Sequence, residues 1–303
     1  MKKVLLATTA LVFSAGFAAA EVTISGSANM GFKYDEGDLA YAGKKAAGWY
    51  EIDMDVTGTM ESDSGLTFGA TIELDSDYAS LAAGQSLADL YDCYLDEGFS
   101  DECAVGSNET LAGSVFVSGA FGTFTVGSVD PVADDIGLTD IGFDGIGTDN
   151  VAEMSAYSGS ADARWDYTVG AVTLGASVNT ISEDYGLLGA YDFGAGKVAL
   201  SFDHDEAGDN DSVGLLVKGT VAGIAGELYV ADDDTTGTSW GVYGAYTTGA
   251  LTLEASYADY DDNEDEAYGI GAKYALGGGA KLAGGVGSVG GDTVADLGVT
   301  FSF

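Results

Sequence analysis

Basic residues and histidine are scarce in this chain of 303 residues. There are 10 Lys and Arg against 49 Asp and Glu, and Arg164 and His204 are the only residues of their kinds. Nucleic-acid binding is excluded, because it needs a basic surface to meet the phosphates. Catalysis by a Ser–His or Cys–His pair would have to use His204, but nothing near it in the sequence completes a triad. No Walker, HExxH or dinucleotide motif is present, so we expect that the protein is not an enzyme.

Cysteine and proline are also rare. Cys93 and Cys103 lie close together in a polar segment, without a CxxC redox or zinc motif. In an exported protein we expect them to form one local disulfide, the alternative being two free thiols. Pro131 is the only proline, and it falls between predicted strands, so the strands have few interruptions.

Long uncharged apolar runs are absent after the first 20 residues. Residues 1–20 begin with Lys2 and Lys3, continue with apolar and small residues, and end in three alanines at Ala20. This pattern predicts a cleaved secretory signal peptide, and a membrane anchor would need a longer run of ~20 apolar residues. We therefore expect one mature domain, residues 21–303, that is either secreted or inserted in an outer membrane by strands.

Acidic, glycine and aromatic residues are abundant. Without the predicted signal, eight basic residues face 49 acidic ones, a formal net charge of −41. Such a charge suggests disorder, yet the chain is 46% hydrophobic and contains 47 Gly, 17 Tyr and 13 Phe. The chain can fold if its acidic and apolar residues are kept on different surfaces.

Apolar and polar residues alternate through most of the chain. Ile52, Met54 and Val56, for example, alternate with Glu51, Asp53 and Asp55. This period of two is typical of a sheet with one apolar and one polar face. Sixteen strands are predicted, near 22–35, 49–61, 65–75, 110–121, 122–128, 164–169, 172–180, 185–193, 196–203, 211–221, 225–231, 239–247, 250–258, 266–276, 280–288 and 293–303.

The connections between these strands alternate in length. Short glycine turns, such as Gly277-Gly278-Gly279, alternate with longer acidic links, such as Ser76 to Glu109 and Val129 to Ala163. Short turns at one rim and long loops at the other are typical of bacterial outer-membrane barrels, in which closure removes the strand edges that lipid does not tolerate. The sequence predicts an all-β, antiparallel, up-and-down transmembrane barrel of 16 strands, a size that leaves an aqueous lumen.

Three segments resemble a known family. Phe121-Gly122-Thr123-Phe124-Thr125-Val126-Gly127 is similar to the fifth-strand entry of trimeric general-diffusion porins. Glu21-Val22-Thr23-Ile24-Ser25-Gly26 resembles the mature start of alphaproteobacterial porins. Gly277-Gly278-Gly279-Ala280, together with the ending from Ala295 to Phe303, resembles their last hairpin. The resemblance implies a porin in the outer membrane of a Gram-negative bacterium, where it contacts lipid and lipopolysaccharide.

The same resemblance implies finer features. It implies a homotrimer, an inward-folded third loop from about Val129 to Ala163, a second loop from Ser76 to Glu109 that reaches a neighbouring subunit, and recognition of the strand ending in Phe303 by the barrel-assembly machinery. In the family, acids of the third loop face basic residues on the opposite wall. Here the candidate constriction acids are Asp130, Asp134, Asp135, Asp140, Asp144, Asp149 and Glu153, and the candidate basic wall residues are Arg164, Lys33, Lys218 and Lys273.

Carboxylates with few counter-charges favour cations. We therefore expect passive diffusion of ions and small hydrophilic solutes with a preference for cations. A substrate-selective channel of the same fold, or a non-conducting anchor or adhesin, remains an alternative. A secreted Ca²⁺-binding β-helix would need repeated GGxGxD nonapeptides, which are absent. No cofactor is expected, and the weak Ca²⁺ candidates are the loop acids Asp232, Asp234, Asp259 and Asp261.

Overall fold

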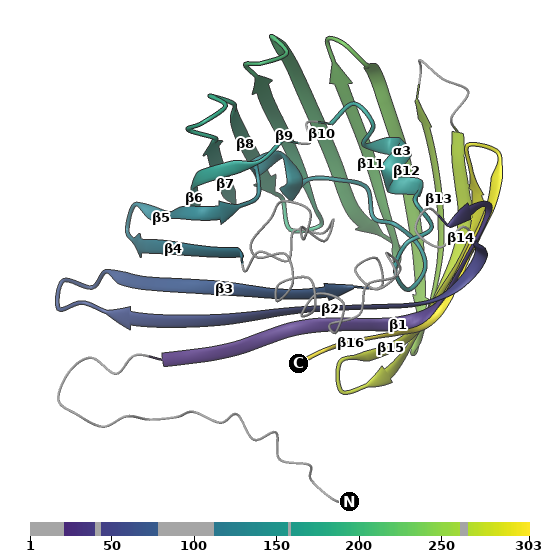
Figure 1. Ribbon diagram of the computed structural model, residues 1–303. Helices are drawn as coiled ribbons and strands as arrows, with labels where there is room; N and C mark the ends of the chain where they lie inside the picture. The colour runs from purple at the N-terminus through teal and green to yellow at the C-terminus, as the bar shows by residue number, and fades with distance from the viewer. Residues whose placement is uncertain (1–20, 40–43, 78–111, 157–158, 261–265) are drawn as a thin grey trace, which may run out of the picture.

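The computed structural model describes residues 21–39, 44–77, 112–156, 159–260 and 266–303. Within these residues, 16 strands form one closed antiparallel barrel (Figure 1). Each strand pairs with its neighbours in the sequence, and β1 closes the ring by pairing with β16. The predicted fold class is confirmed. The strands are β1 (Glu21–Leu39), β2 (Lys44–Glu61), β3 (Thr67–Asp77), β4 (Ala112–Gly119), β5 (Gly122–Val129), β6 (Ala161–Val169), β7 (Val172–Val178), β8 (Tyr185–Asp192), β9 (Gly196–Asp205), β10 (Asn210–Val221), β11 (Ile224–Asp233), β12 (Gly237–Thr248), β13 (Leu251–Tyr260), β14 (Glu266–Gly277), β15 (Ala280–Val289) and β16 (Asp292–Ser302).

Several strands extend further than the sequence predicts, and mainly at one rim. β1, for example, continues to Leu39 and β11 to Asp233. Polar residues at this rim keep their backbone pairing beyond the apolar band, whereas hydrophobic alternation marks only the band itself. We call this end the long-loop rim and the end with the tight connections, such as Gly277 to Ala280, the short-turn rim.

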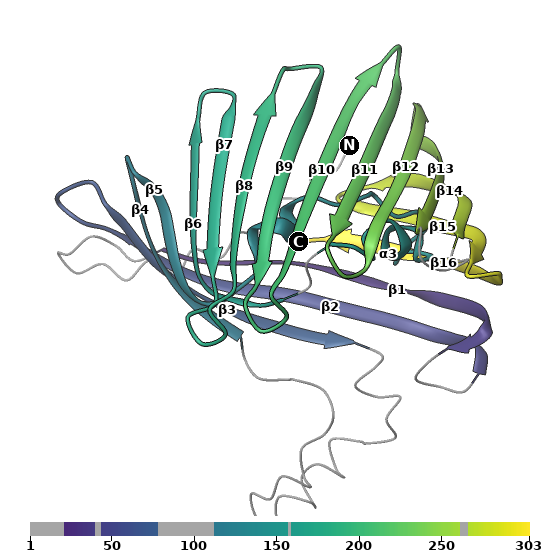
Figure 2. The same cartoon turned by 90° about the horizontal axis from the view of Figure 1, so that it is seen from above.

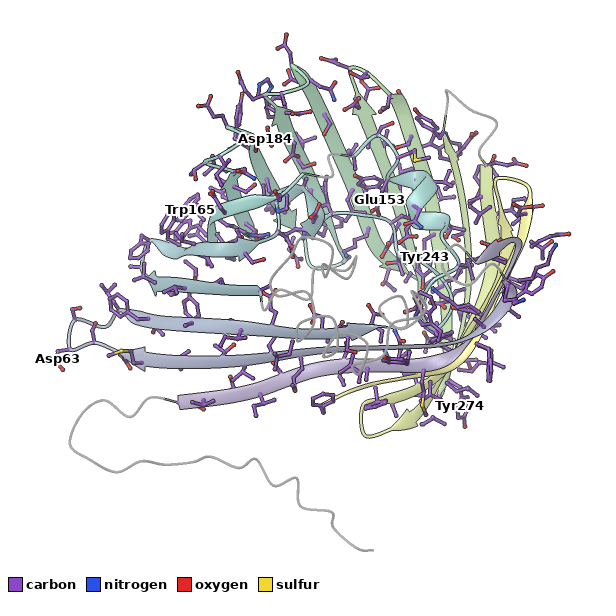
Figure 3. The ribbon with its side chains drawn as sticks, viewed as in Figure 1. Asp63, Glu153, Trp165, Asp184, Tyr243 and Tyr274 are labelled. Carbon is purple, nitrogen blue, oxygen red and sulfur yellow. The ribbon has the colours of Figure 1, made fainter. Side chains whose placement is uncertain are left out.

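The two faces of the wall differ as the alternation predicts. Met30 and Phe32 of β1 and Ile270 of β14 lie outside, more than half exposed, whereas Ala199 of β9 and Ala267 of β14 lie inside and are buried. Figure 3 shows Trp165 and Tyr274 on the outer surface and Glu153 and Tyr243 inside. Neither helical segment in the described residues is long and apolar enough to span a membrane.

The connection between β5 and β6, here called loop 3, enters the barrel. It contains a 3-10 turn, η2 (Val132–Asp135), and a short helix, α3 (Thr148–Ala152). η2 packs against β7 to β9 and α3 against β11 to β14. Seen from above in Figure 2, α3 lies within the ring of strands. The inward-folded third loop is therefore present as predicted.

Large apolar side chains of loop 3 pack onto glycines of the inner wall. An added Cβ at Gly269 would collide with Ile146 Cδ1, and one at Gly298 would lie 2.6 Å from Phe143 Cδ2. Val132 covers Gly175 in the same way. Several glycines of the inner wall thus leave room for the loop, and the barrel acquires an apolar core on the inner side of its wall.

Candidate functional site

Loop 3 is fixed by carboxylates that accept backbone hydrogen bonds. Asp296 of β16 accepts from the N–H groups of Phe143 at 2.8 Å, Asp144 at 3.1 Å and Gly285 at 2.6 Å. Within the loop, Asp140 accepts from the N–H of Gly147 at 2.7 Å and from Thr148 Oγ1 at 2.7 Å, so it lies at the N-terminus of α3, where a negative charge is favoured. The loop thus has a defined path through the lumen.

The seven predicted constriction acids occupy different positions on this path. Asp134 and Asp135 are exposed in η2, and Asp130 is exposed just before it. Asp140, Asp144 and Asp149 border two cavities of 310 and 260 Å³. Glu153 is half-buried and accepts from the N–H of Leu138 at 2.7 Å.

Three of the four predicted basic wall residues already have carboxylate partners. Lys33 pairs with Asp144 and lies 4.4 Å from the centre of the Trp49 ring. Arg164 Nη2 lies 2.5 Å from Asp135 and 2.9 Å from Asp166.

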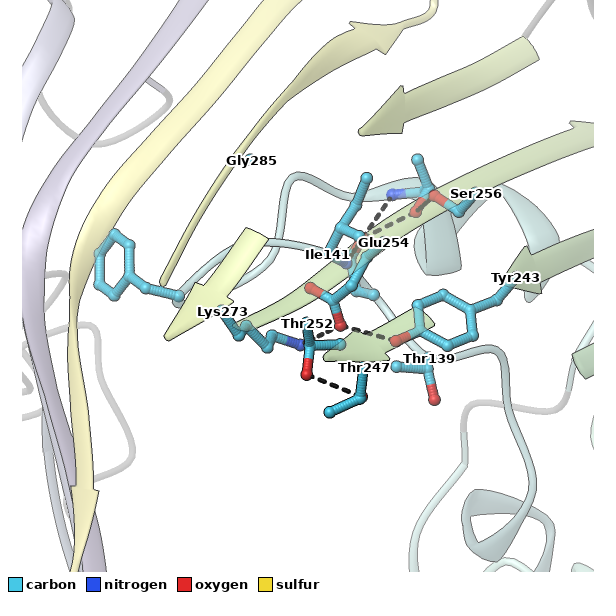
Figure 4. A network of polar contacts seen from close by, with 12 residues as sticks. Thr139, Ile141, Tyr243, Thr247, Thr252, Glu254, Ser256, Lys273 and Gly285 are labelled. Carbon is cyan, nitrogen blue, oxygen red and sulfur yellow. Dashed lines mark hydrogen bonds and ion pairs between the residues drawn. The ribbon is translucent and has the colours of Figure 1, made fainter. Parts of the chain in front are cut away.

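Lys273 is the third paired residue. Its Nζ lies 2.9 Å from Glu254 Oε1, which also accepts from Tyr243 Oη at 2.6 Å (Figure 4). Glu254 is buried, whereas Lys273 stays partly exposed and borders the 310 Å³ cavity. The fourth residue, Lys218, lies beside Lys197 and Glu227 at the short-turn end of the wall.

The wall beyond loop 3 carries a row of acids that the sequence prediction did not include in the site. The row consists of Glu51, Asp53 and Asp55 of β2 and Glu73 and Asp75 of β3; we call it the carboxylate row. Asp53 is directly opposite Asp75, and Asp55 is directly opposite Glu73. Like charges directly opposite each other destabilise a sheet, so the carboxylate row lowers the stability of the folded barrel. The sequence already shows the acids of β2 alternating with Ile52 and Met54. That these acids face the lumen opposite loop 3 can be seen only in the closed barrel.

The carboxylate row and the acids of loop 3 lie near each other. Asn29 Nδ2 donates both to Glu51 Oε2 at 2.8 Å and to Asp144 Oδ1 at 2.6 Å. Glu73 is close enough to Asp130, at the start of loop 3, for the two charges to repel. The lumen is therefore bordered by carboxylates on the loop and on the wall.

Burial raises the pKa of three acids in loop 3, and the smallest rise is that of Asp134, to about 6. Burial raises the pKa of Asp149 to about 7, and the neighbouring Asp140 adds to this shift. Burial also raises the pKa of Glu153 to about 7. Asp149 and Glu153 thus gain their charge near neutral pH rather than near pH 4.

Comparison with known proteins identifies the family. The model of the Gram-negative porin family matches residues 7–293. This chain belongs to that family. A porin of Fuscovulum blasticum is 28% identical over 313 residues, covering 93% of this chain and 100% of the relative. A porin of Rhodobacter capsulatus is 26% identical over 337 residues, with the same coverage.

Solved porin structures show the same fold. A multiply substituted mutant of the Rh. blastica porin superposes with a TM-score of 0.74 at 24% identity, covering 93% of this chain and 100% of that chain. The barrel is therefore an outer-membrane porin, a channel protein that crosses the membrane many times.

The remaining predicted residues are the two cysteines and the Ca²⁺ candidates. Cys93, Cys103 and Asp261 fall outside the described residues. Among the residues that are described, no three His, Cys, Asp or Glu side chains form a group that could hold a metal ion. Asp232 accepts from Thr238 Oγ1 at 2.5 Å, and the backbone N–H of Asp234 donates to the carbonyl of Asp211 at 3.1 Å. Asp259 is directly opposite Glu266 and Trp240 in the barrel wall.

His204 and Phe303, two other residues singled out in the sequence, make contacts at opposite rims of the porin. His204 lies at the long-loop end of β9, with Nδ1 2.6 Å from Asp211 and Nε2 3.3 Å from Glu206. Phe303 exchanges two backbone hydrogen bonds with Gly26 of β1, at 3.0 and 3.1 Å. These bonds extend the pairing of β1 with β16 by one residue.

Removing the guanidinium of Arg164 should free the start of loop 3. Arg164 also donates to the carbonyl of Asp130 at 3.2 Å, so Arg164→Gln leaves Asp135 and Asp166 without their cation. We expect a higher cation-to-anion permeability ratio, because two carboxylates lose their counter-charge, and faster proteolysis within loop 3. Arg164→Lys should restore the charge but not the forked contacts. An unchanged permeability ratio in Arg164→Gln would contradict this prediction.

Proposed function

We propose that this porin forms a water-filled pore through which ions and small hydrophilic solutes diffuse passively, with a preference for cations. The observation that carries the proposal is the carboxylate row, which faces a lumen whose predicted basic residues are mostly paired with other acids. An acidic lining lowers the energy of a passing cation and raises that of an anion. Catalysis has no part in this proposal.

Several finer features belong to the same proposal. A homotrimer fits the resemblance to trimeric porins, as do contacts with lipid and lipopolysaccharide and assembly through recognition of Phe303. Removal of residues 1–20 and a Cys93–Cys103 disulfide fit an exported protein. Cross-linking of the protein in native membranes would test the trimer. Mass spectrometry under non-reducing conditions would test the removal of residues 1–20 and the Cys93–Cys103 disulfide.

The proposed pore is tested by recording from the purified protein in a planar bilayer under a salt gradient. We expect large ohmic steps at high salt and a reversal potential of the cation sign. Absence of conductance, or a reversal potential of the anion sign, would refute the proposal. Small steps that change with one particular solute would favour a substrate-selective channel.

The cation preference should depend on pH through loop 3. Asp149 and Glu153 have pKa values of about 7, so they are neutral well below that pH and charged above it. We expect the cation-to-anion permeability ratio to rise between pH 6 and 8, a window set by the two pKa values. The Asp149→Asn/Glu153→Gln variant should lose most of this rise, and the part that is kept belongs to Asp134, whose pKa is about 6. A wild-type ratio that is constant over this window would contradict the assignment.

The same pKa shifts affect how firmly loop 3 is packed. Each carboxyl has a higher pKa in the packed loop than in water, so the protonated form favours packing. This contribution is complete below the ordinary pKa near 4 and is lost as the pH rises through about 7. Proteolysis of loop 3 should therefore be slower at pH 5 than at pH 8, measured with a protease active at both.

A further inference from the structure

Four lysines of the inner wall lie together at one end of the barrel, near the short turns. Lys197 of β9, Lys218 of β10, Lys273 of β14 and Lys281 of β15 all lie within a few residues of a short turn. Each alternates in phase with an inward-facing residue, such as Ala199 for Lys197 and Ala283 for Lys281. These four lysines are half of the basic residues that follow the predicted signal.

The lysines border open space rather than the packed core. Lys197 and Lys218 are directly opposite each other on neighbouring strands and line a cavity of 400 Å³ with Asp192 and Glu227. Lys273 and Lys281 line the 310 Å³ cavity below loop 3. Acidic and basic side chains alternate here, so this half of the lumen is close to electrical balance.

The other half of the lumen is strongly acidic. The carboxylate row begins about midway along β2 and β3 and continues toward the long-loop rim. The acids of loop 3 lie beside it. Two basic residues of the wall in this region are already paired, Lys33 with Asp144 and Arg164 with Asp135 and Asp166. Lys44 and Lys45 lie at the rim itself, at the start of β2. The fixed charge thus changes from strongly negative to nearly balanced along the pore.

We propose that this gradient makes the pore rectify ionic current. Cations gather in the acidic half because its carboxylates attract them. A voltage that drives cations toward the short-turn rim drives anions toward the acidic half, which holds them back. Both ions then accumulate where the charge changes, and the conductance rises. The opposite voltage drains both ions from this boundary, and the conductance falls.

The inference rests on the proposed pore, but a different measurement tests it. Current–voltage curves are recorded in symmetrical 0.1 M KCl, where the Debye length is about 10 Å. Orientation is set with a hexahistidine insertion after Ser64 of the short-turn rim, blocked by Ni²⁺ added to one chamber. We expect a current about 1.5-fold larger or more when cations move from the long-loop rim to the short-turn rim. In 1 M KCl, where the Debye length is about 3 Å, the ratio should approach one.

Two variants with the same change of charge separate the gradient from the total charge. Lys197→Glu/Lys218→Glu makes the short-turn half acidic, so rectification should disappear while the cation preference rises. Lys44→Glu/Lys45→Glu adds the same charge at the long-loop rim, so rectification should be kept or increased. A symmetrical wild-type curve at 0.1 M, or equal effects of the two variants, would overturn the inference. Such a result, with a cation-sign reversal potential, would leave the proposed pore intact.

Discussion

Neutralising the carboxylate row should remove most of the cation preference. The change is Glu51→Gln, Asp53→Asn, Asp55→Asn, Glu73→Gln and Asp75→Asn, which keeps the side-chain volumes. A unit charge 10 Å from a passing ion contributes about 0.4 kcal/mol in water, so five contribute about 2 kcal/mol before screening. We expect the cation-to-anion permeability ratio, measured from reversal potentials at 0.1 M salt, to fall about fivefold or more.

A matched variant shows whether position or net charge decides the result. Glu36, Asp63, Glu183, Glu206 and Asp209 are exposed acids near the ends of strands. Replacing these five by the corresponding amides changes the net charge equally but leaves the carboxylate row intact. Its permeability ratio should stay near that of the wild type. Equal losses in the two variants would show that the general field of the protein, and not the row, selects the ion.

The row variant should also fold more readily than the wild type. Asp53 is directly opposite Asp75, and Asp55 is directly opposite Glu73, on the two neighbouring strands. Removing such repulsion stabilises a sheet. Refolding into detergent micelles at low salt should therefore give a higher yield for the row variant. The matched variant is the reference for this comparison as well.

Replacing Asp296 by Ala should release the tip of loop 3. The N–H groups of Phe143 and Asp144 lose their acceptor, and hydrogen bonds to charged groups contribute about 1.5–3 kcal/mol each. The loss of about 3–6 kcal/mol is enough to shift a packed loop to a largely released one. We expect a noisier single-channel current and faster hydrogen exchange at residues 143–146.

Asp292→Ala provides the control for this prediction. Asp292 is on the same strand and is exposed at the long-loop rim. Its replacement removes one negative charge but leaves the hydrogen-bond acceptor of loop 3, Asp296, in place. Its current noise and hydrogen exchange should match the wild type. If Asp296→Ala behaves like Asp292→Ala, the path of loop 3 depends on its apolar contacts alone.

The alternation of apolar and polar residues was sufficient to predict all 16 strands and the order in which they pair. The apolar positions of each strand, such as Ile52 and Met54 of β2, show which side faces lipid. Short turns make consecutive strands pair with each other. The ends of strands at the long-loop rim were less accurate, because polar residues there pair without apolar alternation.

The partners of loop 3 could not be predicted in the same way. Ile146 and Gly269, or Asp296 and Phe143, are far apart in the sequence and meet only when the barrel has closed. The carboxylate row was visible as the polar phase of β2 and β3, but its position beyond loop 3 depends on the path of that loop. The partner of each basic residue likewise depends on side-chain geometry, as in Lys33 with Asp144.

The packing of loop 3 onto glycines restricts how the pore can evolve. A methyl group at Gly269 would collide with Ile146, and one at Gly298 would collide with Phe143, so the wall cannot gain volume unless the loop loses it. Truncating Ile146 or Phe143 alone would leave a void over a glycine, which is also costly. Descendants with a wider or narrower passage are therefore expected to differ at both partners together, and the two positions should covary among related sequences.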